Sequence, residues 1–155
     1  MSATASTYVI PQSRKADKAG LEALAFPLVR ITTGLLLIPH GAQKLFGLFG
    51  GYGLQATGQF FGEKLGMHPG LLFAFLAGFV EFFGGLALVT GLLTRTAAIG
   101  VAILMGVALT VHAPNGFFWT GGGVEYPLMW GLMAIAIALK GGGKYSLDQQ
   151  LGLRF

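Results

Sequence analysis

Four long apolar segments follow one another along this chain, separated by short polar or glycine-rich stretches. They cover about residues 23–47, 70–93, 95–113 and 125–140. The first three are long enough to cross the roughly 30 Å hydrocarbon core of a bilayer as helices. The last would be about 24 Å long at helical rise, which is near the lower limit. The pattern therefore predicts an all-α fold, a four-helix transmembrane bundle.

The first apolar segment contains two prolines, Pro27 and Pro39. Proline removes a backbone N–H and crowds the preceding turn, so we expect a long first helix that is kinked near Pro39. Residues 1–22 lack a long apolar run and are predicted to form an N-terminal cytoplasmic tail. Residues 23–155 then form the membrane domain.

Lysine and arginine are distributed unequally between the two ends of the apolar segments. Four spans would place seven of these residues on one side and two, Lys44 and Lys64, on the other. The positive-inside rule then predicts that both termini are cytoplasmic in a multi-pass protein of the inner membrane. An outer loop over 48–69, with a short interfacial helix around Phe60 and Phe61, and a C-terminal tail over 141–155 complete the predicted topology.

Composition supports membrane residence and excludes several kinds of chemistry. Hydrophobic residues make up 54% of the chain and charged residues only 10%, against about 25% charged in soluble domains. Membrane lipid is therefore an expected partner. The basic residues lie at the ends of apolar segments instead of forming one patch, so nucleic acid is not expected. The chain has no cysteine, which excludes a disulfide, a thiol nucleophile and an iron–sulfur cluster held by this chain alone.

Two ionisable residues stand deep inside apolar segments, Arg30 in the first and Glu81 in the second. A charge at bilayer depth is costly unless it is paired or hydrated, so each is a functional candidate. Helical rise places them about 10 and about 18 Å below the same surface, within reach of each other. We expect an ion pair between the first two helices, either purely structural or lining a pocket.

A second polar group is expected in the outer half of the bundle. It consists of His40, Lys44, His112 and Glu125. Converging, they could bind a quinone or phenol headgroup, relay protons or ligate a metal, whereas each alone could snorkel to the interface or cap a helix. No metal site and no catalytic residue is assigned. Haem is not expected, and no CxxCH motif is present for covalent attachment.

Aromatic side chains are expected to form the apolar walls of such a pocket. The candidates are Phe46, Phe75, Phe79 and Phe82, and Trp119, Tyr126 and Trp130 are assigned to an outer aromatic belt, with Trp130 deeper.

The order of several short motifs resembles the DoxX family of small four-helix membrane proteins. The motifs are Arg30 with Gly34, HGAQKLFG at 40–47, Glu81 followed by FFGGLALVTGLLTRTAA, then His112, Glu125 and GGGKYSLD at 141–148. The resemblance covers about residues 24–150. It implies an association with redox chemistry and carries over the same six ionisable residues, Arg30, His40, Lys44, Glu81, His112 and Glu125.

Three functions follow as hypotheses. The first is an integral membrane subunit of a redox system that binds a quinone-like or phenolic ligand non-covalently in a polar intramembrane pocket. As an enzyme it would be at most a quinone-linked oxidoreductase subunit, needing a partner subunit for electron transfer or assembling as a homo-oligomer. The second is a non-catalytic accessory or scaffold subunit of a larger membrane complex. The third is a small-solute transporter, for which four short spans without an inverted repeat would be sparse.

Overall fold

The chain folds into helices joined by short connections. The computed structural model describes the backbone of residues 12–153, with the side chains of 20, 21 and 23–153. The helices are α1 (Gln12–Phe46), α2 (Gly53–Glu63), α3 (Gly70–Phe79), the π-helix η1 (Val80–Gly84), α4 (Gly85–Thr90), α5 (Thr94–His112), the 3₁₀ turns η2 (Ala113–Asn115) and η3 (Trp119–Gly121), α6 (Glu125–Lys140) and α7 (Leu147–Gln150). No strand occurs among the described residues, so the all-α prediction is confirmed.

Three helical stretches are long and apolar enough to cross a membrane. They are Ala23–Phe46 within α1, Gly70–Thr90 formed by α3, η1 and α4 in sequence, and Thr94–Asn115 formed by α5 and η2. α6 has 16 residues and lies alongside α5. The fourth span and the orientation of the termini therefore remain predictions.

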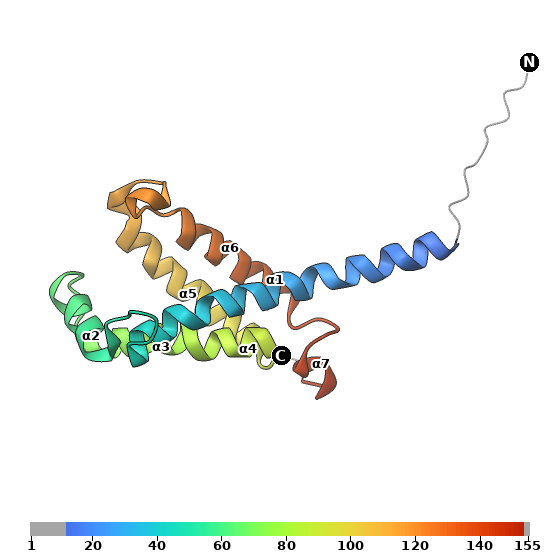
Figure 1. The fold of residues 1–155 in the computed structure, drawn as a ribbon, viewed down its shortest axis with the longest axis horizontal. Coiled ribbons are helices and arrows are strands. Elements are labelled where there is room, and N and C mark those ends of the chain that lie inside the picture. The colour runs from blue at the N-terminus through green and yellow to red at the C-terminus, as the bar shows by residue number, and fades with distance from the viewer. Residues whose placement is uncertain (1–11, 154–155) are drawn as a thin grey trace, which may run out of the picture.

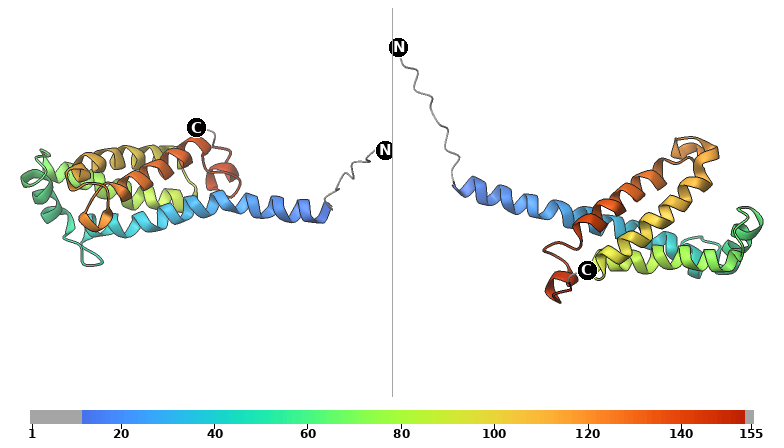
Figure 2. Two further views of the ribbon diagram at one scale, coloured as in Figure 1. Left: turned by 90° about the horizontal axis from the view of Figure 1, so that it is seen from above. Right: turned by 180° about the vertical axis from the view of Figure 1, so that it is seen from behind.

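The helices form two hairpins that meet at one end and separate at the other (Figures 1 and 2). One hairpin contains α1 and the α3–η1–α4 helix, and the other contains α5 and α6. We call the end at which they meet the α7 end and the opposite end the α2 end. The buried apolar core includes Leu88, Val101 and Ile137 and extends along α1 and α5 to Leu37 and Met105. The two hairpins therefore pack together at the α7 end and also through η1 and α5.

Glycines bring α1 close to the helix that runs antiparallel to it. A Cβ on Gly34 would collide with the Gly85 carbonyl, and one on Gly41 would collide with the backbone of Gly78 and Phe82. These contacts fix the register of the two helices, because each α1 position faces a defined position on the α3–η1–α4 helix. Gly41 is level with η1, and Lys44, less than one turn further along, lies beside it.

The first helix is continuous and begins earlier than the expected segment. The helix runs without a break through Pro27 and Pro39, so neither proline interrupts it. A kink near Pro39 remains a prediction. The helix also begins at Gln12, so the described part of the predicted tail over 1–22 is helical, while residues 1–11 lie outside the described residues. In Figure 1 this part of α1 projects beyond the bundle.

The C-terminal segment, expected as a tail, is folded against the α7 end. The Asp148 carboxylate accepts hydrogen bonds from the backbone N–H groups of Leu93 (2.7 Å) and Thr94 (2.9 Å), which begin α5. The Asp148 N–H in turn donates to the Gly91 carbonyl at 2.9 Å. Since the first N–H groups of a helix have no partner within the helix, Asp148 supplies a cap from a distant part of the chain.

Candidate ligand-binding site

An ion pair lies where the two hairpins separate. The Lys44 ammonium on α1 donates to both carboxylate oxygens of Glu81 on η1, at 2.9 and 2.7 Å. The Glu81 side chain is 9% exposed and that of Lys44 is 26% exposed. The carboxylate is thus enclosed by protein, while part of the ammonium remains accessible.

Glu81 lies on the five-residue π-helix η1, which interrupts the regular α-helix between α3 and α4. A π-helical turn accommodates an extra residue, and such insertions occur frequently at functional sites. The turn rotates the residues that follow it relative to those before. Glu81 is buried here, while Phe79 before it and Phe83 after it are both exposed.

Arg30 does not pair with Glu81, so the expected partner of Glu81 was wrong. Arg30 is fully buried and donates instead to the Leu88 and Val89 carbonyls at the end of α4 and to the Tyr145 carbonyl (2.7 Å). The antiparallel register explains the difference, because it sets Arg30 beside the end of α4 and Lys44 beside η1. The last carbonyls of a helix lack partners within it and attract a cation. Arg30 therefore joins α1 to the end of α4 and to the C-terminal segment.

A cavity of about 270 Å³ opens beside the ion pair, and we call it the aromatic cavity. It is bounded by α1, η1, α5, the 115–124 connection and α6. Four of the six predicted site residues line it: His40, Lys44, Glu81 and His112. An apolar protein cavity of about 150 Å³ is large enough for benzene, so this space accommodates a substituted single ring.

Aromatic side chains form one wall of this cavity, though not those expected from the sequence. Trp119, Tyr126 and Trp130 line it. The expected walls, Phe46, Phe75, Phe79 and Phe82, do not. Phe75 and Phe79 are instead exposed on the outer face of α3. Trp130 stands out in the sequence as a tryptophan inside an apolar segment. Sequence analysis predicted how deep it lies in the membrane but did not predict that its ring lines the cavity.

His112 and Lys44 leave hydrogen-bonding capacity beside the cavity. His112 Nδ1 lies 2.6 Å from the Gly122 carbonyl, and because a carbonyl only accepts, Nδ1 carries the proton. In neutral His112, Nε2 is then an acceptor. An ammonium has three N–H groups, and Lys44 donates to the two oxygens of Glu81. The site thus combines an available donor with an available acceptor. His40, by contrast, is exposed at its edge.

Glu125 does not line the aromatic cavity but supports its wall. Its carboxylate accepts a hydrogen bond from the Trp119 backbone N–H at 3.0 Å. The Trp119 ring stacks on that of Tyr126, with centroids 5.4 Å apart and planes 5° from parallel. Glu125 is therefore a positioning residue for the 115–124 connection.

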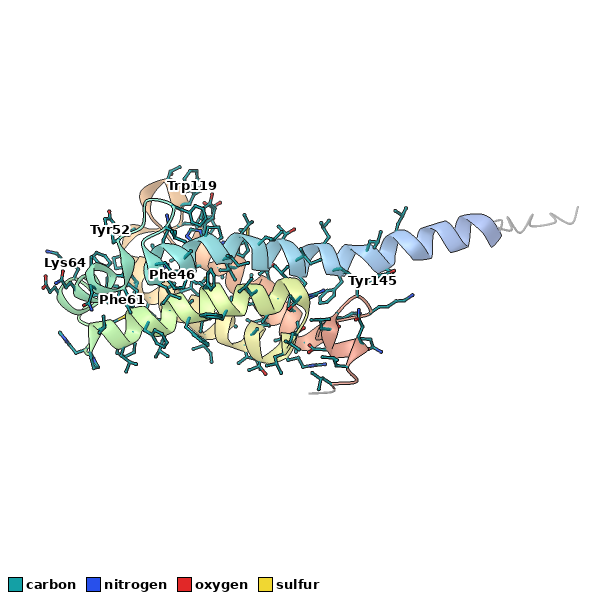
Figure 3. The ribbon with its side chains drawn as sticks, turned by 60° about the horizontal axis from the view of Figure 1, so that its bottom comes forward. Phe46, Tyr52, Phe61, Lys64, Trp119 and Tyr145 are labelled. Carbon is teal, nitrogen blue, oxygen red and sulfur yellow. The ribbon has the colours of Figure 1, made fainter. Side chains whose placement is uncertain are left out.

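A second hollow of about 200 Å³, which we call the apolar groove, runs between α2 and α5. Its walls are apolar, with Phe60, Phe61 and Leu65 on one side and Leu104, Val107, Ala108 and Val111 on the other. Lys44, Glu81 and His112 line it as well. Figure 3 shows Phe61 and Trp119 at the same end of the molecule, far from Tyr145. The short helix predicted around Phe60 and Phe61 is present as α2, although sequence analysis gave it only an interfacial role.

Comparison with known proteins gives a consistent family assignment. The DoxX family model matches residues 25–113. A Bacillus subtilis protein named "Putative oxidoreductase CatD" is 31% identical over 122 residues, covering 78% of this chain and 82% of that protein. The "Uncharacterized membrane protein Rv3486" of Mycobacterium tuberculosis is 31% identical over 140 residues, covering 81% of this chain and 80% of that protein. No solved structure matches.

Proposed function

This chain belongs to the DoxX family of membrane proteins, and we propose that it serves as a membrane subunit of a redox system by binding a quinone-like or phenolic ring in the aromatic cavity. The observation that carries the proposal is the meeting of Lys44, Glu81 and His112 at a cavity walled by Trp119, Tyr126 and Trp130. Ligand pockets commonly combine aromatic walls with a few polar groups that fix orientation.

The polar groups match both redox states of such a ring. A quinone carbonyl accepts a hydrogen bond, which the Lys44 ammonium can donate, and Glu81 holds that ammonium in place. A phenol or hydroquinone hydroxyl donates, and His112 Nε2 accepts when Nδ1 is bound to the Gly122 carbonyl. Reduction of a quinone to a hydroquinone takes up two electrons and two protons. Lys44 and His112 lie where protons would be exchanged, and the electrons would come from a partner subunit.

The relative named as an oxidoreductase supports a redox role, and the membrane spans support a lipid-soluble reactant. Quinones add readily to thiolates, and this chain has no cysteine. Covalent addition to a thiol therefore cannot be mistaken for binding in the test described next.

The test measures ligand-induced stabilisation of the protein in lipid nanodiscs. The probes are 2,3-dimethoxy-5-methyl-1,4-benzoquinone, which has no tail, and its hydroquinone. A ligand at a hundredfold excess over its Kd stabilises the folded state by about 2.7 kcal/mol and raises the Tm accordingly. We expect this increase in wild type, a smaller one in His112→Ala and in His40→Ala, and an unchanged one in the control His68→Ala, which alters an exposed histidine away from the cavity.

No increase in wild type, or the same increase in His112→Ala and His40→Ala as in wild type, would contradict the proposal. Either result would favour a non-catalytic accessory subunit.

A further inference from the structure

The aromatic cavity and the apolar groove meet at the same polar residues. Lys44, Glu81 and His112 line both hollows, and Met105 and Ala108 form part of both walls. Beyond these shared residues the two hollows have different linings. The cavity continues toward Trp119 and Tyr126, whereas the groove continues between α2 and α5.

We propose that the ligand carries a long apolar chain and that this chain lies in the apolar groove while the ring occupies the aromatic cavity. This inference rests on the proposed function and narrows its substrate class to a prenylated or otherwise tailed ring. The shared residues carry it, because a ring held beside Lys44 and Glu81 lies against the same side chains that line the groove, which makes the groove the adjoining apolar space.

The lining of the groove determines the chemistry of its occupant. Away from Lys44, Glu81 and His112 it contains phenylalanine, leucine, valine, alanine and methionine side chains. Such walls offer no hydrogen bond and no countercharge, so a polar or charged substituent would lose its hydration without compensation. An apolar chain meets no such penalty.

The groove is also open at the surface of the bundle. Val107, on its α5 wall, is 44% exposed, and Phe60, on its α2 wall, is 51% exposed. Val107 lies within the candidate span Thr94–Asn115, so we expect this opening to face lipid. A tailed ligand could therefore enter sideways from the membrane, leaving its chain between α2 and α5.

The experiment compares two rings that differ only in their tails. One is the tailless benzoquinone used above, and the other is the same ring with a tail of two prenyl units. Apparent affinities are measured in nanodiscs for wild type, Val107→Trp and Ile103→Trp. Val107 lines the groove, whereas Ile103, one turn earlier on α5 and 65% exposed, lines neither hollow. The two variants therefore place the same tryptophan side chain at two different positions on α5.

In wild type and in Ile103→Trp we expect the tailed ring to bind at least tenfold more tightly than the tailless ring. In Val107→Trp this advantage should disappear. The tail partitions into lipid to the same extent for both variants. A difference between them in the affinity gained from the tail therefore shows that the tail binds in the groove. Phe60→Ala, which removes an exposed part of the opposite wall, should reduce the advantage as well and serves if Val107→Trp does not fold.

An undiminished advantage of the tailed ring in Val107→Trp or in Phe60→Ala would overturn the inference and would mean that lipid chains fill the groove. Binding of the tailless ring with no gain from the tail in wild type would also overturn it while leaving the proposed function standing. Failure of the tailless ring to bind wild type would contradict the proposed function itself.

Discussion

Lys44 is the partner of Glu81, and the two hydrogen bonds between them join α1 to η1 where the hairpins separate. Leu37 and Met105 of the buried core line the cavity beside this pair, and other core residues such as Leu88 and Ile137 line neither hollow. The ion pair is thus a polar link at the α2 end, beside the space in which we place the ligand.

Removing one member of this pair is expected to destabilise the protein. Glu81→Gln leaves the Lys44 ammonium without a countercharge at membrane depth. Loss of one partner of a buried pair costs about 3–5 kcal/mol, but Lys44 is a quarter exposed, so we expect about 1–3 kcal/mol. Glu63→Gln, at an exposed carboxylate on α2, should cost about 0–1 kcal/mol.

Thermal unfolding in nanodiscs checks this prediction. The double variant Lys44→Met/Glu81→Gln should recover much of the loss, because neither charge is then left alone. Equal Tm values for Glu81→Gln and Glu63→Gln would mean that the pair does not contribute to stability.

The helices were predictable from sequence because their signal is local. Apolar segments predicted over 70–93, 95–113 and 125–140 correspond to Gly70–Thr90, Thr94–His112 and Glu125–Lys140. The C-terminal segment binds the start of α5 through Asp148, and we call this contact the clasp. It was not predictable, since Asp148 caps a helix that begins 54 residues earlier. No local pattern marks such a contact.

Sequence analysis selected four of the residues that line the aromatic cavity, but it gave Glu81 the wrong partner. A charge inside an apolar segment is visible in sequence, which is why His40, Lys44, Glu81 and His112 were selected and line one cavity. Pairing depends on the register of two antiparallel helices, and the glycine contacts that set this register appear only when both helices are seen together. Depth counted from predicted segment ends placed Arg30 near Glu81 for that reason.

Orientation in the membrane is open to direct measurement. The excess of lysine and arginine predicts that the α7 end is cytoplasmic and the α2 end faces outward. Because the chain has no cysteine, single cysteines can be introduced without background. We expect Tyr52→Cys, at an 86% exposed position, to react with an impermeant maleimide in intact cells, and Lys144→Cys to react only after lysis. The reverse pattern would invert the topology.

Close packing of α1 predicts opposite effects of two glycine-to-alanine substitutions. In Gly41→Ala the new methyl group collides with the backbone of Gly78 and Phe82, which backbone movement must relieve. Overpacking typically costs about 1–3 kcal/mol, more than the gain of about 1 kcal/mol in helix propensity. In Gly106→Ala no atom beyond the adjacent residues and the nearby backbone of the same helix lies within 4 Å of the new Cβ, so only the propensity gain remains. The free energy of unfolding should be lower than that of wild type in Gly41→Ala and equal to or higher than it in Gly106→Ala. A change of the same sign in both variants would contradict the packing argument.

The clasp at the α7 end predicts a local opening on loss of Asp148. Its carboxylate accepts from the N–H groups of Leu93 and Thr94, and an anion at this position also interacts favourably with the helix dipole. Asp148→Ala should cost about 0.5–2 kcal/mol, as removal of helix caps does, and Asp148→Asn, which retains one acceptor oxygen, should cost less. Gln150→Ala, at an exposed position on the same short helix, serves as the control.

Limited trypsin digestion separates this local effect from a global loss of stability. Lys140 and Lys144 flank the glycine-rich turn that leads into the clasp, and Arg30 holds the turn through the Tyr145 carbonyl. Releasing Asp148 removes the anchor on the other side, so cleavage after Lys140 and Lys144 should accelerate in Asp148→Ala at temperatures well below its Tm. Cleavage at the rate seen in Gln150→Ala would show that Arg30 alone holds the segment in place.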